Sequence, residues 1–359
     1  MSSTALAWER CAARSFLDDP QLRRDWDALN AACGAPPVLA SEFIAAALNH
    51  LASGAEQLLV ARRGEAAVAM AVMAPVSRLQ WATFQPSQLP LGAFVSAPGE
   101  DLTTLGLQAM RSVLRSALAV SFTQVDPRLA ARGGDGPSVR HDNYVETAWV
   151  SIEGDFDSYW ATRGKNLRQN LRKQRNRLAS EGASFETRTW RAKSEVVAAL
   201  ARYGDLESLG WKATQGTAIE SGNVQGRFYR ALLEAAAERG EALVHEYLLG
   251  GRTVAMNLSV LRGRTLVILK TTYDESTKPL SPAFLLHEDQ LREFFASGAF
   301  DRVEYYGRVM EWHTRWTDHK RMLFHTTVYR WPIVRALAER RRRMQTPAPA
   351  PTPSHESVA

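Results

Sequence analysis

One segment late in the chain has polar residues of the types, and at the spacing, that can bind a charged ligand. Residues 265–273 have the pattern of a β-strand and carry Lys270, Thr272 and Tyr273 among apolar neighbours. A turn then leads to Ser281–Pro282, where serine is a favourable helix N-cap and proline suits the first helical position. Backbone N–H groups at such a helix start bind anions such as a pyrophosphate, although most Ser-Pro starts are only caps.

The anion site predicted from this pattern combines the end of the strand with the first turn of the helix. Its expected members are Thr271, Thr272, Ser281, Ala283, Phe284 and Leu285. Strict alternation along the strand places Leu266, Ile268, Lys270 and Thr272 on one side, and Val267, Leu269, Thr271 and Tyr273 on the other. The two sides of the strand are therefore expected to offer different polar groups.

The elements that must position these residues occur twice along the chain. Residues 57–72, around Gly64, predict a β-hairpin, and residues 243–258, around Gly250–Gly251, repeat it. Each hairpin is followed by a third strand, a helix and a further strand, and the two copies lie a domain length apart. We expect an α/β (α+β) fold of two tandem modules, each a mixed, mostly antiparallel sheet flanked by helices. Any reaction is expected in the second copy, because its strands carry the polar residues.

Length and composition agree with two folded units. The 359 residues are 45% hydrophobic and 23% charged, and no apolar run approaches the roughly 20 residues that span a bilayer. We expect an N-terminal, structural module over 1–153, a C-terminal, catalytic module over 154–335, and a basic, Pro/Ala-rich disordered tail over 336–359. The first residues lack a signal-peptide pattern, so a cytoplasmic protein is expected. Two cysteines, Cys11 and Cys33, indicate neither a disulfide framework nor a metal site.

The net charge of +6 is concentrated in two blocks. The first is a predicted helix over 163–177 with seven basic residues and no acid, and the second is Arg340–Arg343. Such blocks can bind phosphate, anionic polysaccharide, a membrane surface or RNA, and a solvated helix face is the alternative. We expect Arg168 and Arg172 to contact an anionic substrate.

The order of these elements, together with several short motifs, resembles the GNAT acyltransferase superfamily. The resemblance is strongest to double-module proteins of the cellulose-biosynthesis acetyltransferase (CelD-like) type, relatives of the FemAB-type aminoacyltransferases, and it covers roughly Trp26 to Trp331. Tyr273–Asp274 and Ser281–Pro282–Ala283 stand where the family has Tyr-Asp before Ser-Pro-Gly. The other matching motifs are the acidic Glu304, the segment Trp312–Thr317 in place of Tyr-Lys-x-x-Trp-Thr, and Gly210–Trp211–Lys212 before Gly216–Thr217.

The resemblance implies transfer of an acyl group from acetyl-CoA or another acyl-CoA, with no metal. Such a reaction needs a base for the amine proton, a donor for the thioester carbonyl and an acid for the leaving thiolate. Glu304 is the expected base, with pairing to Arg302, Arg308 or Arg315 as the alternative, and Tyr273 is the expected acid. His313 is expected as a substrate contact, with a base or a turn residue without a role as the alternatives. Residues expected to contact substrate are Trp211, Lys212, Asn257 and Trp312.

Three departures from the family pattern bear on the cofactor. Ala283 replaces glycine, His313 replaces lysine, and the Gln/Arg-x-x-Gly-x-Gly/Ala loop of ordinary GNAT enzymes is absent. Coenzyme A is therefore implied by the superfamily and not by a motif.

The function implied is acylation, with acetyl as the expected group, of an amine or hydroxyl on a small or saccharide acceptor in polysaccharide or cell-envelope biosynthesis. One alternative is a FemAB-like aminoacyl-tRNA-dependent transferase, which makes tRNA the alternative partner, although no pair of consecutive long helices is visible. A second alternative is a non-catalytic assembly protein of a polysaccharide pathway. A homo-oligomer is compatible with the sequence.

Overall fold

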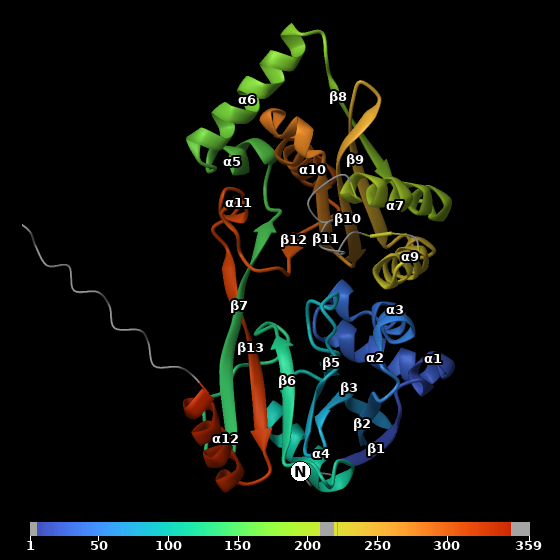
Figure 1. Cartoon of the computed structure of the whole chain (residues 1–359), viewed down its shortest axis with the longest axis vertical. Helices are drawn as coiled ribbons and strands as arrows, with labels where there is room; N and C mark the ends of the chain where they lie inside the picture. The colour runs from blue at the N-terminus through green and yellow to red at the C-terminus, as the bar shows by residue number, and fades with distance from the viewer. Residues whose placement is uncertain (1–5, 209–218, 221, 346–359) are drawn as a thin grey trace, which may run out of the picture.

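The computed structural model describes residues 6–208, 219–220 and 222–345. Two halves are stacked along the long axis of the molecule and share one 13-stranded sheet (Figure 1). The strand order is β1-β2-β3-β4-β6-β13-β7-β12-β11-β10-β9-β8, and β5 pairs with β3. The pairs β4–β6 and β11–β12 are parallel and the other pairs are antiparallel. The predicted fold class, two modules with mixed and mostly antiparallel sheets, is confirmed.

The first half is built from the N-terminal strands and helices. Its strands are β1 (Ala7–Ala12), β2 (Gln57–Arg63), β3 (Ala66–Ser77), β4 (Gln80–Thr83), β5 (Phe94–Ser96) and β6 (Ala119–Val125). Its helices are α1 (Ser15–Asp18), α2 (Pro20–Ala32), η1 (Pro37–Leu39), α3 (Ser41–Leu51), α4 (Leu102–Ser112) and, from the end of the chain, α12 (Pro332–Gln345).

The second half repeats this order of strands. Its strands are β8 (Phe185–Trp190), β9 (Ala242–Leu249), β10 (Arg252–Arg262), β11 (Thr265–Tyr273) and β12 (Arg302–Tyr305). Its helices are α5 (Phe156–Ala161), α6 (Lys165–Ser180), α7 (Lys193–Ser208), α9 (Val224–Ala237), η2 (Glu275–Leu280), α10 (Pro282–Ser297) and α11 (Glu311–Thr314). Gly250 and Gly251 join β9 to β10 with φ values of 56° and 80°, which favour the tight turn of a hairpin.

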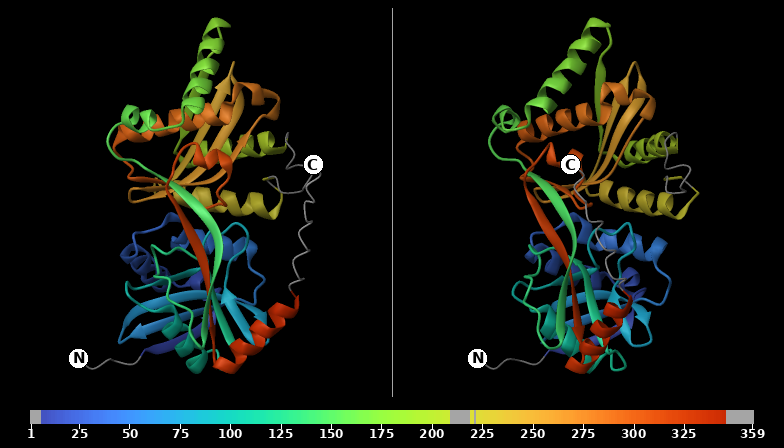
Figure 2. Two further views of the ribbon diagram at one scale, coloured as in Figure 1. Left: turned by 90° about the vertical axis from the view of Figure 1, so that its left-hand side faces the viewer. Right: turned by 60° about the vertical axis from the view of Figure 1, so that its left-hand side comes forward.

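Two long strands, β7 (Val139–Ser151) and β13 (Lys320–Tyr329), run between the halves (Figure 2). β7 follows β6 in the chain, but its end pairs with β12 of the second half, as in the pair Val150–Val303. β13 follows β12, but it pairs with β6 of the first half, as in Tyr329–Ala119. The last strand of each half therefore completes the sheet of the other half.

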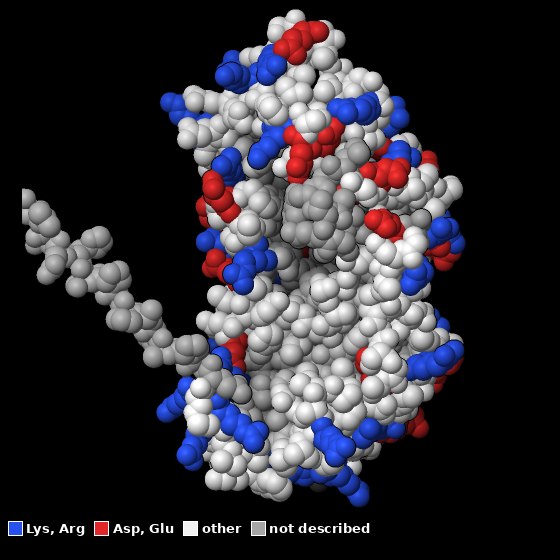
Figure 3. Space-filling view, viewed as in Figure 1, with Lys and Arg blue, Asp and Glu red and all other residues white. Residues whose placement is uncertain are grey.

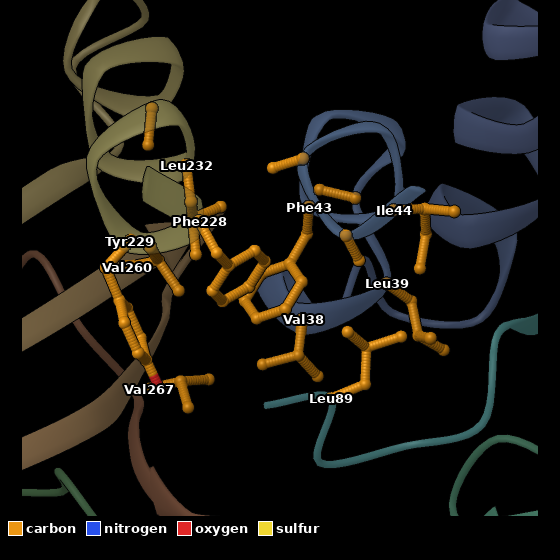
Figure 4. Packing of buried hydrophobic residues seen from close by; sticks show 14 of the residues in the cluster. Val38, Leu39, Phe43, Ile44, Leu89, Phe228, Tyr229, Leu232, Val260 and Val267 are labelled. Atoms are coloured by element: carbon orange, nitrogen blue, oxygen red, sulfur yellow. The ribbon is translucent and has the colours of Figure 1, made fainter. Parts of the chain in front are cut away.

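One buried apolar cluster is continuous through both halves. It joins α2 and α3 of the first half to α7 and α9 of the second. At its centre the rings of Phe43 on α3 and Phe228 on α9 meet edge to face, with centroids 5.8 Å apart (Figure 4). Separate clusters pack α10 against the second half's sheet and α4 against the first half's sheet. The halves are thus held together by a core as well as by the shared strands.

Candidate active site

The parallel strands β11 and β12 separate soon after they pair. Their ladder contains three pairs, from Thr265–Arg302 to Val267–Glu304. Beyond Val267, the edge of β11 that faces β12 has no strand partner in the described part of the chain. The start of α10 and the short helix α11 lie at this opening. The opening is a cavity of about 550 Å³.

The walls of this cavity come from β10, β11, α10, the end of β12 and α11. The lining residues are Asn257, Ile268, Leu269, Lys270, Thr271, Tyr273, Ala283, Phe284, His287, Tyr305, Gly307, Trp312, His313 and Trp316. Seven residues predicted from the sequence are thereby brought together: Thr271, Tyr273, Ala283, Phe284, Asn257, Trp312 and His313. The wall combines aromatic surfaces with a small number of hydrogen-bonding groups, as ligand cavities usually do.

A β-bulge in β11 determines which polar groups reach the cavity from each side. The pairing with β10 passes from Leu258–Lys270 to Ser259–Ile268, so Leu269 is an extra residue. The predicted strict alternation is therefore wrong beyond Ile268. Leu266, Ile268 and Tyr273 all pack in the cluster beneath α10, although alternation separates Tyr273 from the other two.

Lys270 points from β11 toward α7 and α9. Its ammonium group lies 3.1 Å from a carboxylate oxygen of buried Glu207 and 5.4 Å from the centre of the Tyr229 ring. Glu207 also accepts a hydrogen bond from the backbone N–H of Ile219. The cavity therefore has a fixed cationic group on its α7 side.

His313 is held in one protonation form by the backbone. The backbone N–H of Met310 donates to His313 Nδ1 at 2.9 Å, so the neutral ring carries its proton on Nε2. Burial lowers the pKa of His313 to about 4. The ring also stacks on Trp312, with centroids 3.6 Å apart. At neutral pH this histidine is suited to donate a hydrogen bond from Nε2 and is poorly suited to accept a proton.

His287 and Tyr305 form a second polar pair at the cavity wall. His287 Nε2 and the Tyr305 hydroxyl oxygen are 2.5 Å apart, and both side chains are nearly fully buried. Burial lowers the pKa of His287 to about 3, and burial raises the pKa of Tyr305 well above its ordinary value. Both groups are therefore neutral at physiological pH, and the pair can share one proton without creating a charge.

Asn257 is buried in the cavity wall beneath α10. Its Nδ2 donates to Gln290 Oε1 at 2.5 Å, whereas Asn257 Oδ1 has no hydrogen-bond partner in the described structure. Buried polar atoms are usually satisfied, so a water molecule or a ligand in the cavity is the natural partner of this oxygen.

Glu304 lies outside the cavity, in contrast to the expectation that it acts as the base. Its fully buried carboxylate accepts from Arg128 at 2.8 Å, from Arg321 at 2.9 Å and from Arg302 at 3.3 Å. Burial raises the pKa of Glu304, while Arg321 and Arg128 oppose that rise. Since both carboxylate oxygens are occupied by guanidinium groups, we assign Glu304 to an ion-pair network that joins the halves through Asp126.

The predicted anion site at the start of α10 is only partly supported by the geometry. The backbone N–H groups of Phe284 and Leu285 both donate to the Ser281 carbonyl, and Pro282 has no N–H group. Ser281 is not among the lining residues, and Leu285 is fully buried in the core below α10. Thr272 is buried and does not line the cavity either. The first turn of α10 therefore offers an anion few free donors.

The remaining predicted contacts lie elsewhere. Arg168 and Arg172 line a separate groove between α6 and α10, together with Arg292 and Lys165. Groove and cavity share a wall, because Trp160 in the groove stacks on Trp316 in the cavity with centroids 5.8 Å apart. Trp211 and Lys212 lie outside the described residues.

Sequence reasoning missed several residues of the cavity. His287 and Tyr305 belong to no predicted motif, and Trp316 and Lys270 had no assigned role. Helical spacing from Ala283 contains a signal for His287, because a residue four positions later lies on the same face of α10. No sequence signal connects His287 to Tyr305.

Comparison with known families decides the class of this site. Residues 165–320 match the family described as Acetyltransferase (GNAT) domain, a segment that contains β11, α10, β12 and α11. This match supports an acyltransferase site in the second half, and the predicted resemblance to the GNAT superfamily is confirmed.

Solved structures extend the similarity of fold to both halves. The crystal structure of FemX has a TM-score of 0.55 at 10% identity, over 92% of this chain and 99% of FemX. The C-terminal domain (DUF2156) of a putative lysylphosphatidylglycerol synthetase from Agrobacterium fabrum has a TM-score of 0.54 at 13% identity, over 89% of this chain and 96% of that domain. L-PGS from Bacillus licheniformis has a TM-score of 0.50 at 16% identity, over 90% and 96% of the two chains.

The TM-scores establish a common fold, but sequence identities of 10%, 13% and 16% do not establish a common substrate. No curated protein matches the sequence significantly. In the described part of the chain, no helix is long and apolar enough to cross a membrane, and no cluster of side chains is suited to a metal ion.

Proposed function

We propose that the cavity between β11 and β12 binds an acyl-CoA and transfers its acyl group to an amine acceptor. The observation that carries this proposal is an opening of about 550 Å³ beside the unpaired edge of β11, within the GNAT domain. Acetyl is the expected group. We retain a hydroxyl, and a saccharide acceptor of polysaccharide or cell-envelope biosynthesis, as the wider acceptor class.

The residues of the cavity suit such a donor in shape and chemistry. The unpaired edge of β11 can hydrogen-bond an extended, amide-containing arm, and Phe284 and Trp316 offer aromatic surfaces. The phosphates would lie toward the adjoining groove, where Arg168 and Arg172 supply positive charge. Coenzyme A would supply the thioester whose C–S bond breaks as the new C–N bond forms.

Each polar residue then has a role in moving protons or stabilising charge. His313, with its proton on Nε2, donates to the carbonyl oxygen as negative charge develops there. Tyr273 donates its hydroxyl proton toward the leaving sulfur. The neutral pair of Tyr305 and His287 orients the attacking amine by hydrogen bonding. The proton that the amine loses passes, directly or through water, to the Tyr273 oxygen after that group has protonated the sulfur. Asn257 orients the acceptor through its unsatisfied Oδ1.

We further propose that the first half has a structural role and that catalysis belongs to the second half. In the first half, the space at the end of β6, which is also lined by β5 and Gly92, is only about 20 Å³, too small for a cofactor. This difference supports a single donor site in the protein.

Binding of the donor tests the proposal directly. Acetyl-CoA at 100 times its dissociation constant should add about 2.7 kcal/mol to the free energy of unfolding, which a thermal-shift titration detects. Ala283→Trp places an indole in the cavity and should abolish the shift. Ala201→Trp, on an exposed position of α7, is the matched control and should retain it. If no acyl-CoA shifts the protein at millimolar concentration, the proposal is wrong.

An aminoacyl-tRNA donor is the second candidate, and the exposed basic helix α6 favours it. In the acyl-CoA case, Arg168→Gln/Arg172→Gln should raise the Michaelis constant at low salt, and the effect should shrink as ionic strength rises. In the tRNA case, binding to bulk tRNA should fall steeply on a log–log plot between about 50 and 200 mM salt. Steep salt dependence together with aminoacyl transfer from charged tRNA would replace our choice of donor.

A further inference from the structure

The helix α12 presents an apolar stripe to solvent at the base of the first half. Ile333, Leu337 and Met344 are 63%, 55% and 70% exposed, and Trp331, just before the helix, is 53% exposed. Their spacing places the three helical residues on one face. Single exposed apolar residues are common on protein surfaces, but four on one short segment are not.

The opposite face of α12 is fixed to the body of the protein. Arg335 donates to the Gly136 carbonyl and pairs with Glu339 at 2.8 Å, and Arg342 pairs with Asp142 at 2.9 Å. Val334 is half-buried. Because these contacts hold one face of the helix against the sheet, the apolar stripe is turned away from the core.

Three arginines accompany the stripe. Arg340 lies on the same face as Ile333 and Leu337, and Arg341 and Arg343 flank it. All three are exposed, and none has an acidic partner in the described structure. In Figure 3, Lys and Arg side chains gather at the lower left of the molecule, where α12 lies in Figure 1. An apolar stripe edged by unpaired arginines is the pattern of a helix that lies in a membrane interface.

The hairpin between β3 and β4 extends the same surface. Val76 and Leu79 are 59% and 49% exposed, and Arg78 between them is also exposed. The backbone connects the hairpin to the segment that leads into α12, because Leu118 donates to the Leu79 carbonyl and accepts from the N–H of Arg330. The surface therefore combines two apolar segments with at least four exposed arginines.

We propose that this surface, formed by Trp331, α12 and the hairpin around Leu79, binds the face of an anionic phospholipid membrane. The apolar side chains would enter the boundary between head groups and acyl chains, and the arginines would pair with lipid phosphates. Aliphatic side chains such as Ile333 and Leu337 give RNA no stacking platform, so the stripe favours lipid. The surface lies at the opposite end of the molecule from α6, so docking leaves the groove and cavity of the second half open to solvent (Figure 1).

Co-sedimentation of the full chain with vesicles tests this proposal. We expect binding to phosphatidylcholine vesicles that contain phosphatidylglycerol, and none to phosphatidylcholine alone. Ile333→Ser/Leu337→Ser should weaken binding at least tenfold. Arg340→Gln/Arg341→Gln/Arg343→Gln should weaken it about a hundredfold at low salt. These positions are exposed, so the variants should keep the parent's melting temperature.

Two control variants separate this surface from general effects of charge and apolar exposure. Val224→Ser removes an exposed apolar side chain from α9, and Arg172→Gln/Lys173→Gln removes basic charge from α6. Both should bind vesicles like the parent chain. The proposal is overturned if the α6 variant loses binding while the α12 variants retain it, or if anionic vesicles do not bind at all. It is also overturned if Ile333→Ser/Leu337→Ser only converts a dimer to a monomer, because a second copy would then cover the stripe.

Discussion

The two halves of the molecule contain the same pair of parallel strands but differ in what lies between them. β4 and β6 pair over three positions, from Gln80–Ala119 to Ala82–Ser121, just as β11 and β12 do. Beyond this point the first half closes, because β5 occupies the edge of β3 and Gly92 donates to the Thr123 carbonyl at 3.2 Å. In the second half the corresponding space is the cavity.

The cause of the difference is the connection that follows β4 in the first half and β11 in the second half. In the first half residues 84–101 return across the gap before α4 begins, whereas in the second half only residues 274–281 separate β11 from α10. Gly92 lies so close to Thr123 and Thr83 that a Cβ atom would clash with both. The two halves therefore share one arrangement of strands, and the length of one connection decides whether the space beside them is an open cavity or is filled by protein.

The largest expected effect comes from replacing His313, which lines the cavity of the second half. His313→Phe should lower turnover by about 10²–10³, the usual cost of removing one hydrogen-bond donor from developing charge. Donor affinity should change little, because the stacking on Trp312 is kept. His319→Phe, an exposed histidine stacked on Trp149, is the matched control. A variant with full turnover would remove His313 from the mechanism.

The next largest effect concerns the network that joins the two halves. Glu304→Gln should lower the free energy of unfolding by roughly 3 kcal/mol, because Arg321, only 8% exposed, loses one of its two carboxylate partners. Urea unfolding measures this loss. Glu311→Gln, an exposed carboxylate paired with Arg315, should cost less than about 1 kcal/mol. A stable Glu304→Gln protein that binds acetyl-CoA but does not turn over would restore Glu304 as the base.

The packing around Gly92, which closes the first half, can be tested by adding a single methyl group at this position. Gly92→Ala forces a Cβ against Thr123 and Thr83 and should destabilise the protein by about 1–3 kcal/mol. Gly134→Ala, where no atom lies within 4 Å of the added Cβ, is the control and should be nearly neutral. Equal stability of the two variants would show that Gly92 is not what closes the first half.

The smallest effect is a pH dependence that arises in the open half. The pKa values of His313 and His287 are lowered to about 4 and about 3 by burial, so the folded state resists protonation. Between about pH 6.5 and pH 4 the unfolded chain binds more protons, so stability falls as pH falls, by about 1.4 kcal/mol per pH unit for each histidine. Unfolding measured from pH 7 to pH 5 should show a shallower slope for His313→Phe than for the parent. An unchanged slope would mean that His313 titrates normally in the folded state.

The sequence predicted those features that are set by local patterns. The two hairpins and the helix that begins at Pro282 follow from residue types and spacing. The grouping of Tyr273 with His313 was implied by the family resemblance, and both line the cavity. The bulge at Leu269 was not predictable, because alternation gives no sign of an extra residue. The partners of Glu304 were not predictable either, since Arg128 lies 176 residues away in the chain. Contacts of that range are set by the exchange of strands and not by any local pattern.

The exchange of β7 and β13 also determines when the sheet of the first half can be completed during synthesis. The first half emerges from the ribosome first, but its sheet stays incomplete until residues 320–329 have been made, because β13 is the strand that covers β6. Until then β6 presents an open edge, and such edges invite pairing with other chains. The N-terminal half should therefore aggregate when it is expressed alone, and cutting the gene between the halves yields two fragments that each lack a strand.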